Sequence, residues 1–239
     1  MNVDIITTLV CDFDGTLATC PYDFAQMHRA VAATAKEYDI PPEVTAHLGL
    51  LEIIAVGAEW LCADAERAMK FQTAAMARLS AIENEAARQT ELLSGICDAL
   101  QALKTAGYRL GIVTRNSTAA VKMIIGTAPL PYDALLTRDD VAHPKPHVEH
   151  ALHMLRLLKS QPACSLMVGD HPMDIALGKA AGMPTVAVLT GQTSAANLRA
   201  AQPDLLLPSV CELTTLLLSE PPQSRSESCH AATSPQSAE

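Results

Sequence analysis

Four short apolar runs, each ending abruptly at a polar residue, constrain the fold of this chain more than any other feature. They are "LVCDFD", "LGIVTRN", "SLMVGD" and "TVAVLTG", and they end at Asp12 with Asp14, Thr114, Asp170 and Thr190. Because their hydrophobicity is continuous and does not alternate, both faces of each strand should be buried, as in a parallel sheet covered by helices. Two weaker runs, "DALLT" and "PDLLLPS", are further candidate strands.

Helical patterns fill the intervals between these runs. The segment "SGICDALQALKTAG" opens at Ser94, a candidate N-cap, and closes at Gly107, a candidate C-cap. Since right-handed crossovers permit few other arrangements, the alternation predicts an α/β fold with a doubly wound parallel sheet. This Rossmann-like core should comprise residues 1–19 and 91–219.

Residues 20–90 interrupt the alternation. They lack a convincing strand and contain long Ala-rich amphipathic stretches, broken at Pro41 with Pro42 and near Gly57. We expect a small all-helical domain inserted after the first strand. Residues 220–239 are Ser/Pro-rich and lack periodicity, which predicts a disordered tail.

Charge and cysteine content exclude several classes of partner. The formal net charge is -9 over 239 residues with no Lys/Arg block, so nucleic acid and anionic membranes are not expected partners. The seven cysteines are odd in number and form no C-x-x-C pair, which argues against a disulfide framework and favours a reducing compartment. The first apolar run reaches Asp12 too soon for a secretory or membrane segment. We expect a cytoplasmic protein, a monomer or homodimer.

The polar strand ends should form one binding crevice, because ligands of open parallel sheets bind beyond the carboxyl ends of the strands. The candidates are Asp12, Asp14, Thr114 and Asp170, with Asp174 one helical turn past Asp170 and Lys145 in the loop "AHPKPH". Carboxylates gathered in one crevice repel each other, and a cation relieves this. An all-oxygen ligand set selects a hard ion, and Mg²⁺ suits a site that keeps phosphate oxygens as further ligands.

Phosphate is therefore the expected guest. Lys145 supplies positive charge, while the Thr114 hydroxyl and the amides of Arg115 and Asn116 can donate hydrogen bonds to phosphoryl oxygens. Two aspartates two residues apart suggest a division of labour in which one attacks phosphorus and the other handles protons. Gly15 permits a tight turn directly after Asp14.

The ordered motifs "DFDGTL", "VTRN", "HPKP" and "VGDHPMD" resemble those of the haloacid dehalogenase-like (HAD) superfamily. The insertion after the first motif is similar to its helical-cap subclass, and the surroundings of the second and fourth motifs are similar to its phosphoglycolate phosphatase-like branch. By this resemblance Asp12 is the nucleophile that becomes an aspartyl phosphate, and Asp14 is the acid and base. Thr114 and Lys145 hold the phosphoryl group. Asp12, the Asp14 carbonyl and Asp170 bind Mg²⁺, with Asp174 in support.

Three positions depart from the family pattern. His171 and Pro172 stand where a small hydroxyl residue is common, and His147 stands where a second proline often follows the lysine. These departures concern the geometry of two loops. His143, His147, His150 and His153 also form a series, which we interpret as a polar face and not as a metal site.

The sequence thus predicts an Mg²⁺-dependent phosphatase that acts on a small phosphorylated metabolite, with the helical domain acting as a cap. A sugar-phosphate mutase would use the same aspartates but return the phosphoryl group to a second hydroxyl. A non-enzymatic phosphorylation switch or a binding module is the alternative from another class. The large insertion after the first strand and the filled chemical positions argue against both non-enzymatic alternatives.

Overall fold

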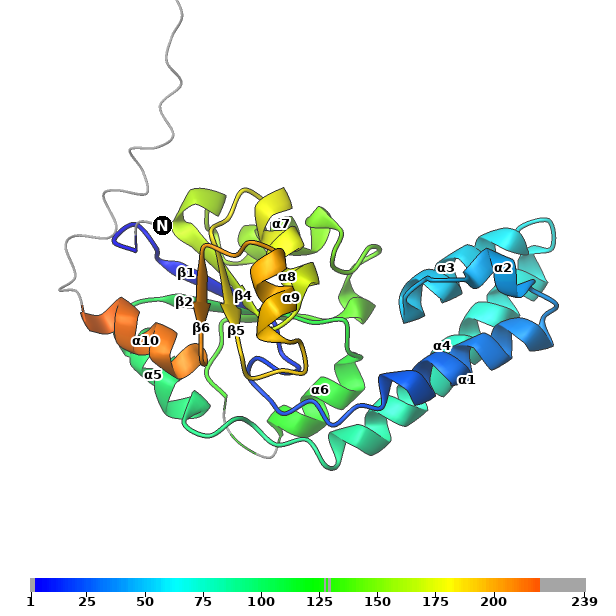
Figure 1. The fold of residues 1–239 in the computed structure, drawn as a ribbon, viewed down its shortest axis with the longest axis horizontal. Helices are drawn as coiled ribbons and strands as arrows, with labels where there is room; N and C mark the ends of the chain where they lie inside the picture. Colours follow the sequence, from blue (N-terminus) through cyan, green and yellow to red (C-terminus); the bar gives the residue numbers. More distant parts are fainter. Residues whose placement is uncertain (1–2, 127, 129, 220–239) are drawn as a thin grey trace, which may run out of the picture. The chain divides into compact units, whose positions relative to one another are not determined.

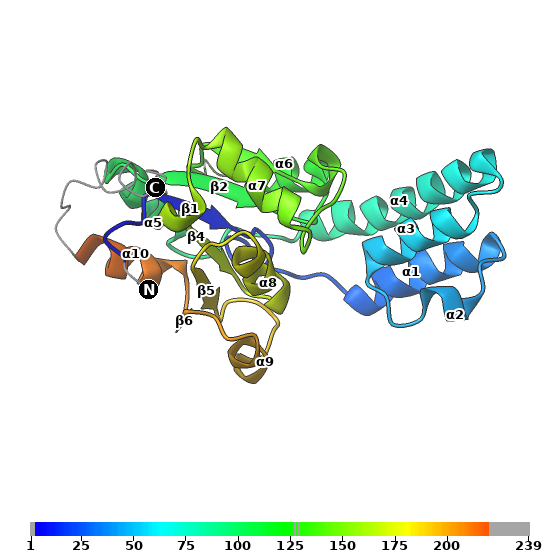
Figure 2. The ribbon, with the colours of Figure 1, turned by 90° about the horizontal axis from the view of Figure 1, so that it is seen from above.

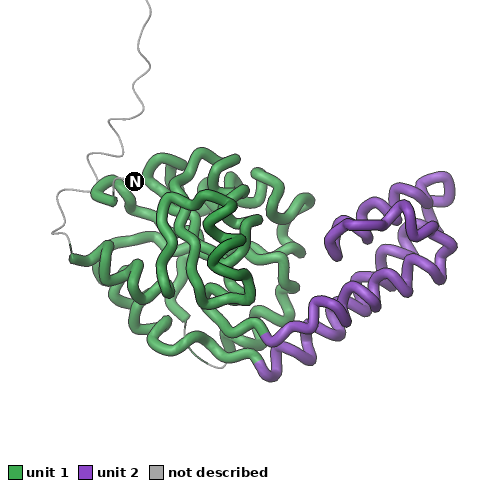
Figure 3. Tube along the Cα trace, in the orientation of Figure 1, with its two compact units in different colours: residues 1–20, 90–239 green, residues 21–89 purple. Residues whose placement is uncertain are grey.

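The computed structural model describes residues 3–126, 128 and 130–219. The tail expected at 220–239 lies outside the described residues. The chain divides into two compact units, one with residues 1–20 and 90–239 and the other with residues 21–89 (Figure 3).

The larger unit is built on a six-stranded parallel sheet in the order β3-β2-β1-β4-β5-β6, and most of this order can be followed in Figure 2. The strands are β1 (Thr8–Cys11), β2 (Arg109–Val113), β3 (Ala134–Leu136), β4 (Ser165–Gly169), β5 (Thr185–Val188) and β6 (Leu205–Leu207). In register, Val10 of β1 pairs with Gly111 on one side and Met167 on the other. The predicted parallel sheet is confirmed, including its two weaker strands.

Helices cover both faces of this sheet (Figure 1). They are α5 (Ile96–Thr105), α6 (Thr118–Ile125), α7 (Val148–Leu157), α8 (Pro172–Ala180), α9 (Ala195–Ala200) and α10 (Val210–Ser219), with short 3-10 turns η1 (Arg138–Asp140) and η2 (Pro162–Cys164). Helices α7 and α8 pack on each other and on β2 to β5, while α5 and α10 pack together on the other face. Val10, Met154, Met167 and Leu177 are wholly buried in the core beneath α7 and α8.

Helix α5 begins and ends within one residue of the expected caps. Its N-cap is Gly95, in the left-handed region at φ 74°, and not Ser94. Its C-cap is Ala106, one residue before the expected Gly107, which follows at φ 88° with its amide donating to Lys104 O at 3.0 Å. A residue without Cβ adopts this conformation at least cost.

The smaller unit is entirely helical over residues 21–89, all of which are described. Its helices are α1 (Phe24–Glu37), α2 (Pro42–Thr45), α3 (Leu50–Trp60) and α4 (Ala65–Ala87), and α1 and α3 pack on α4. Pro42 starts a helix, as its lack of an amide hydrogen allows. The break expected near Gly57 was wrong: α3 continues through Gly57, where a Cβ would lie 2.6 Å from the Phe71 ring. The glycine serves close helix packing.

None of the helices formed by the described residues is long and apolar enough to cross a membrane.

The contact between α8 and the sheet yields a test of this packing, which matters because α8 carries Asp174. A Cβ on Gly178 would lie 2.5 Å from Thr185 Cγ2 and 2.8 Å from Met167 Cβ. These two residues belong to β5 and β4. Gly178→Ala should therefore destabilise the protein by about 2 kcal/mol in urea unfolding, despite the better helix propensity of alanine. Ala176→Ser, at an exposed position of the same helix, should cost less than about 0.5 kcal/mol. A stabilised Gly178→Ala protein would contradict the packing.

Candidate functional site

Three neighbouring strands bring polar side chains to one edge of the sheet. Asp12 follows β1, Thr114 follows β2 and Asp170 follows β4, and β1 lies between the other two strands. The ladder of backbone hydrogen bonds continues past the strands: the Asp12 amide donates to Val168 O at 2.8 Å, and the Thr114 amide donates to Leu136 O at 3.0 Å. The backbone itself therefore fixes the positions from which these side chains project.

Three buried carboxylates form the centre of this edge. Asp12, Asp170 and Asp174 each offer an oxygen, and these atoms all lie within 4.8 Å of one another. Asp174 comes from the first turn of α8, where its carboxylate accepts a hydrogen bond from the His171 amide at 3.1 Å. This contact belongs to a capping box and holds Asp174 in place.

Lys145 enters the cluster from the loop before α7. Its ammonium group donates hydrogen bonds to Asp12 Oδ1 and, at 2.8 Å, to Asp174 Oδ1. The side chain is buried, as are both partners. Lys145 therefore compensates part of the negative charge that the buried carboxylates bring together.

Burial and mutual repulsion shift the titration of the cluster. Burial raises the pKa of Asp12 well above its usual range; Lys145 opposes this and the neighbouring carboxylates add to it. Burial and Asp174 raise the pKa of Asp170 to about 6. Burial acts to lower the pKa of Lys145, but Asp12 and Asp174 reverse this and the net direction is upward. The cluster thus favours an added positive charge or bound protons.

The side chain of Asp14 does not belong to this group of three carboxylates. Its carboxylate accepts hydrogen bonds from Thr114 Oγ1 at 3.1 Å and from Asn116 Nδ2 at 3.1 Å. Thr114 Oγ1 in turn accepts from the Asn116 amide at 3.0 Å. The sequence analysis expected the Thr114 hydroxyl and the Asn116 backbone amide to bind a phosphoryl group, and in this structure the hydroxyl donates to Asp14 while the amide donates to Thr114 Oγ1.

The Arg115 side chain makes its contact outside the group of expected phosphate ligands. Its guanidinium group donates to Met173 Sδ at 3.4 Å on α8, and its carbonyl accepts from Arg138 Nη1 at 2.9 Å. The expectation for Arg115 concerned its backbone amide only.

Two glycines make room for Asp170. A Cβ on Gly191 would lie 1.7 Å from Asp170 Oδ2, and a Cβ on Gly15 would lie 2.6 Å from the same atom. Gly15 also adopts φ 82°, as the tight turn after Asp14 requires. Thr16 completes the surroundings by donating a hydrogen bond to Asp170 Oδ1 at 3.1 Å. Neither Thr16 nor Gly191 was singled out by the sequence analysis.

The carboxylate cluster fits a divalent cation. Three buried carboxylates face one ammonium group, so a cation would balance the remaining negative charge. All the donors are oxygens, which suits a hard ion such as Mg²⁺. The side chains in this group are Asp12, Asp170 and Asp174; the Asp14 side chain lies with Thr114 and Asn116, and its expected contribution was its backbone carbonyl.

Two of the departures from the family pattern act as helix caps. His171 Nδ1 accepts from the Met173 amide at 3.1 Å at the start of α8, and His147 Nδ1 accepts from the Glu149 amide at 3.3 Å at the start of α7. A ring nitrogen thus performs the task of a capping hydroxyl, which explains how these loops keep their helix entries.

The remaining histidines of the series differ in exposure, and His153 is half-buried. His143 lies exposed with its ring centroid 4.8 Å from that of His147. His150, by contrast, is completely buried. The interpretation of the series as a polar face was therefore wrong for His150, because it lies on the side of α7 that is buried with Ala151, Met154 and Leu155.

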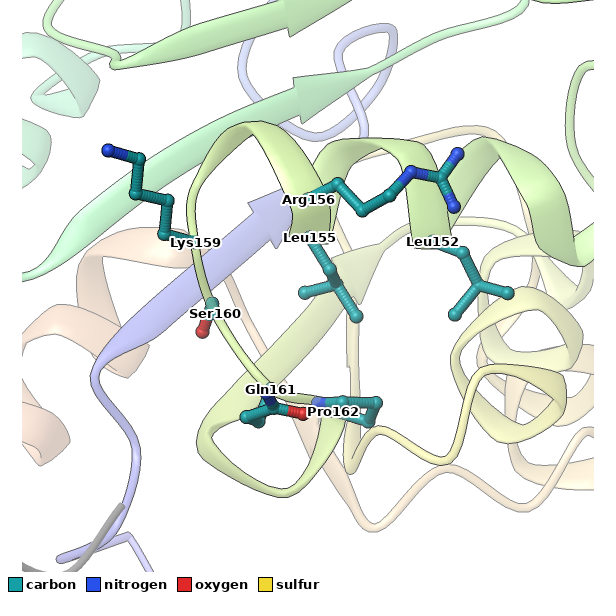
Figure 4. A pocket seen from close by; sticks show the side chains of 7 residues that line it. All are labelled: Leu152, Leu155, Arg156, Lys159, Ser160, Gln161 and Pro162. Carbon is teal, nitrogen blue, oxygen red and sulfur yellow. The ribbon is translucent and has the colours of Figure 1, made fainter. Parts of the chain in front are cut away.

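A cavity of about 470 Å³ lies elsewhere in the larger unit (Figure 4). Its lining includes Leu152, Arg156, Ser160 and Pro162, from the end of α7 and the segment leading into β4. It is therefore at the amino end of β4, whereas Asp170 follows the carboxyl end. None of the expected site residues lines it.

Comparison with known proteins agrees with the fold and the motif order. Residues 9–188 match the family model of haloacid dehalogenase-like hydrolases. The pyrophosphatase PpaX of Bacillus mycoides (strain KBAB4) is 39% identical over 124 residues, which cover 51% of this chain and 58% of the relative. The match thus spans a little over half the length of that curated relative.

Solved structures share the fold at lower identity. A crystal structure of a predicted phosphatase from Clostridium acetobutylicum superposes with a TM-score of 0.64 at 22% identity, covering 90% of this chain and 99% of that one. A predicted phosphoglycolate phosphatase from Haemophilus somnus 129PT gives 0.63 at 20% identity, covering 89% and 98%. The resemblance noted in the sequence is confirmed: the chain belongs to the haloacid dehalogenase-like hydrolases.

Proposed function

We propose that this protein is an Mg²⁺-dependent phosphatase that hydrolyses a small-metabolite phosphomonoester through an aspartyl-phosphate intermediate. The observation that carries the proposal is the buried group of Asp12, Asp170, Asp174 and Lys145 at the carboxyl edge of the sheet. Asp14 stands two residues from Asp12, on the turn that leaves β1.

Asp12 is the proposed nucleophile. In the first step one of its oxygens forms a bond to phosphorus while the bond to the leaving oxygen breaks, and Asp14 gives that oxygen a proton. In the second step water attacks phosphorus, Asp14 accepts its proton, and the bond to Asp12 breaks to release inorganic phosphate. The rigid strand end supports the first role and the adjoining turn supports the second.

The proposed phosphate ligands are the Thr114 hydroxyl, the amides of Arg115 and Asn116, and the Lys145 ammonium group. Lys145 also lowers the cost of keeping Asp12 ionised, since it donates directly to Asp12 Oδ1. As the phosphoryl group arrives, the Thr114 hydroxyl must leave Asp14 and the Asn116 amide must leave Thr114 Oγ1, because these are the acceptors of their hydrogen bonds in this structure.

Asp12, the Asp14 carbonyl and Asp170 are the proposed Mg²⁺ ligands, with Asp174 in support. When bound, the ion would neutralise charge on the phosphoryl oxygens and between the carboxylates.

The helical unit is the proposed cap, which would exclude water and select the substrate. Its support is its composition of four helices inserted between β1 and β2. The cytoplasmic location and the monomeric or homodimeric state remain predictions from the sequence.

A panel of phosphorylated metabolites, assayed for inorganic phosphate release with Mg²⁺ and with EDTA, tests the activity. Pyrophosphate belongs in the panel because the curated relative is named a pyrophosphatase. A hexose 1-phosphate separates the mutase alternative, which would yield an isomer in place of free phosphate. Release from at least one compound, abolished by EDTA, is the expected result. Release from none would count against the proposal.

Asp12→Asn should lower kcat at least about a thousandfold, because an amide oxygen is a poor nucleophile. The similar shape of asparagine should leave the circular dichroism spectrum unchanged. Asp98→Asn is a suitable control, since Asp98 is exposed on α5 and should retain full activity. Substantial turnover by Asp12→Asn would mean that another group attacks phosphorus.

Asp170→Asn should make the metal-free protein more stable than wild type at pH 8. At pH 4 this gain in stability should be smaller. The pKa of Asp170 is raised to about 6, so the stability it contributes is present below its ordinary pKa near 3.8 and is lost as pH rises through 6. The gain at pH 8 should be about 3 kcal/mol, measured by thermal unfolding in EDTA.

Mg²⁺ should reverse this order, because the ion stabilises only a protein that binds it. Wild type should then gain melting temperature at pH 8 while Asp170→Asn gains little, and Asp98→Asn should behave as wild type throughout. Equal destabilisation of Asp170→Asn at both pH values, with an unchanged response to Mg²⁺, would remove Asp170 from the metal site.

A further inference from the structure

His150 is a buried titratable group that the proposed chemistry does not use. It lies in the first turn of α7 with a relative exposure of 0%, although His143 and His147 in the preceding loop are exposed. A polar ring in such a position must satisfy both nitrogens or lose hydrogen bonds that water would provide.

Both ring nitrogens of His150 meet backbone groups. The Lys145 amide lies 3.0 Å from Nδ1, and Leu136 O lies 3.3 Å from Nε2. An amide can only donate, so Nδ1 must be the accepting, unprotonated nitrogen. A neutral ring then carries its proton on Nε2, where it faces a carbonyl that can accept it. The two partners therefore select one tautomer.

The Leu136 carbonyl has a second donor. The Thr114 amide also donates to it, at 3.0 Å, across the parallel pairing of β2 and β3. One ring thus connects the backbone of Lys145 to the carbonyl that anchors Thr114. These two residues come from separate loops and carry the two side chains proposed to hold the phosphoryl group.

The surroundings keep the ring neutral. Burial, and next the charge of Lys145, lower the pKa of His150 to about 4. A proton on Nδ1 would set it against the Lys145 amide, donor to donor, and the bond would be lost.

We propose that His150 is a positioning residue: its Nε2-protonated ring fixes the Lys145 loop against the end of β3 and so sets the separation of the Lys145 and Thr114 phosphate ligands. This role rests on the proposed function, whereas the tautomer and the hydrogen bonds do not. A ring that merely filled core space would need neither bond, and leucine would replace it with little effect on ligand binding.

Two measurements test the hydrogen bonds of His150 without any substrate. In ¹⁵N-labelled protein, long-range ring correlations should show His150 as the neutral Nε2-protonated tautomer from pH 5 to 8, with the signals assigned by their loss in His150→Asn. Amide exchange at Lys145 should be slow in wild type. It should accelerate at least about tenfold in His150→Leu, which removes the acceptor.

Two further variants separate the two bonds. His150→Asn places an oxygen near the position of Nδ1 and should retain slow exchange at Lys145. His150→Gln places a donor near the position of Nε2 and should not. An Nδ1-protonated ring, a ring that titrates near pH 6.5, or Lys145 exchange that is unchanged in His150→Leu would overturn the proposal whether or not the protein is a phosphatase.

Kinetics test the consequence for the site. His150→Leu should raise KM for the best substrate, and the inhibition constant of inorganic phosphate, about tenfold, with a smaller change in kcat. His150→Asn should restore both constants to within about threefold of wild type. Leu155→Val, at a buried position on the same helix, is the matched control for lost stability and should leave both constants unchanged. Equal effects of His150→Leu and Leu155→Val would show a purely structural role and overturn the proposal.

Discussion

The candidate site depends on three carboxylates that are buried beside one ammonium group. Charges in such a position cost free energy unless each has partners, and here Lys145 supplies two of the contacts while Thr16 and the His171 amide supply others. The arrangement remains deficient in positive charge. Burial raises the pKa of Asp12 and Asp170, which means that the folded protein holds these groups in a state that a bound cation would relieve. The burial of these carboxylates therefore lowers the stability of the metal-free protein at the place where the chemistry is proposed.

Parallel pairing is what makes this concentration of charge possible. The carboxyl ends of β1, β2 and β4 meet at one edge, so residues more than a hundred positions apart in sequence share a small volume. Helix α8 then adds Asp174 through its first turn, and its close contact with β4 and β5 depends on Gly178. The loop that carries Lys145 has no such strand to define it. We attribute its placement to His150, whose ring bonds both the Lys145 amide and the Leu136 carbonyl at the end of β3.

The sequence was sufficient for the sheet and the motif order because continuous apolar runs and polar strand ends report burial directly. It was insufficient wherever tertiary packing decides. Gly57 has the signature of a helix break, but the nearness of Phe71 explains it inside a helix. Ser94 is the better cap by residue type, yet the chain turns through Gly95. His150 could not be told from its exposed neighbours, since three-residue spacing does not say which position faces the core. The Asp14 contacts with Thr114 and Asn116 likewise depend on side-chain direction.

The central claim is that Asp12 carries the phosphoryl group during turnover, and chemical trapping tests it most directly. Protein mixed with a hydrolysed substrate would be quenched in acid, reduced with borohydride and mapped by peptide mass spectrometry, since borohydride converts an aspartyl phosphate to homoserine. The account predicts homoserine at position 12, dependent on substrate and on Mg²⁺. Homoserine at another aspartate, or its absence at position 12 under conditions of active turnover, would contradict it.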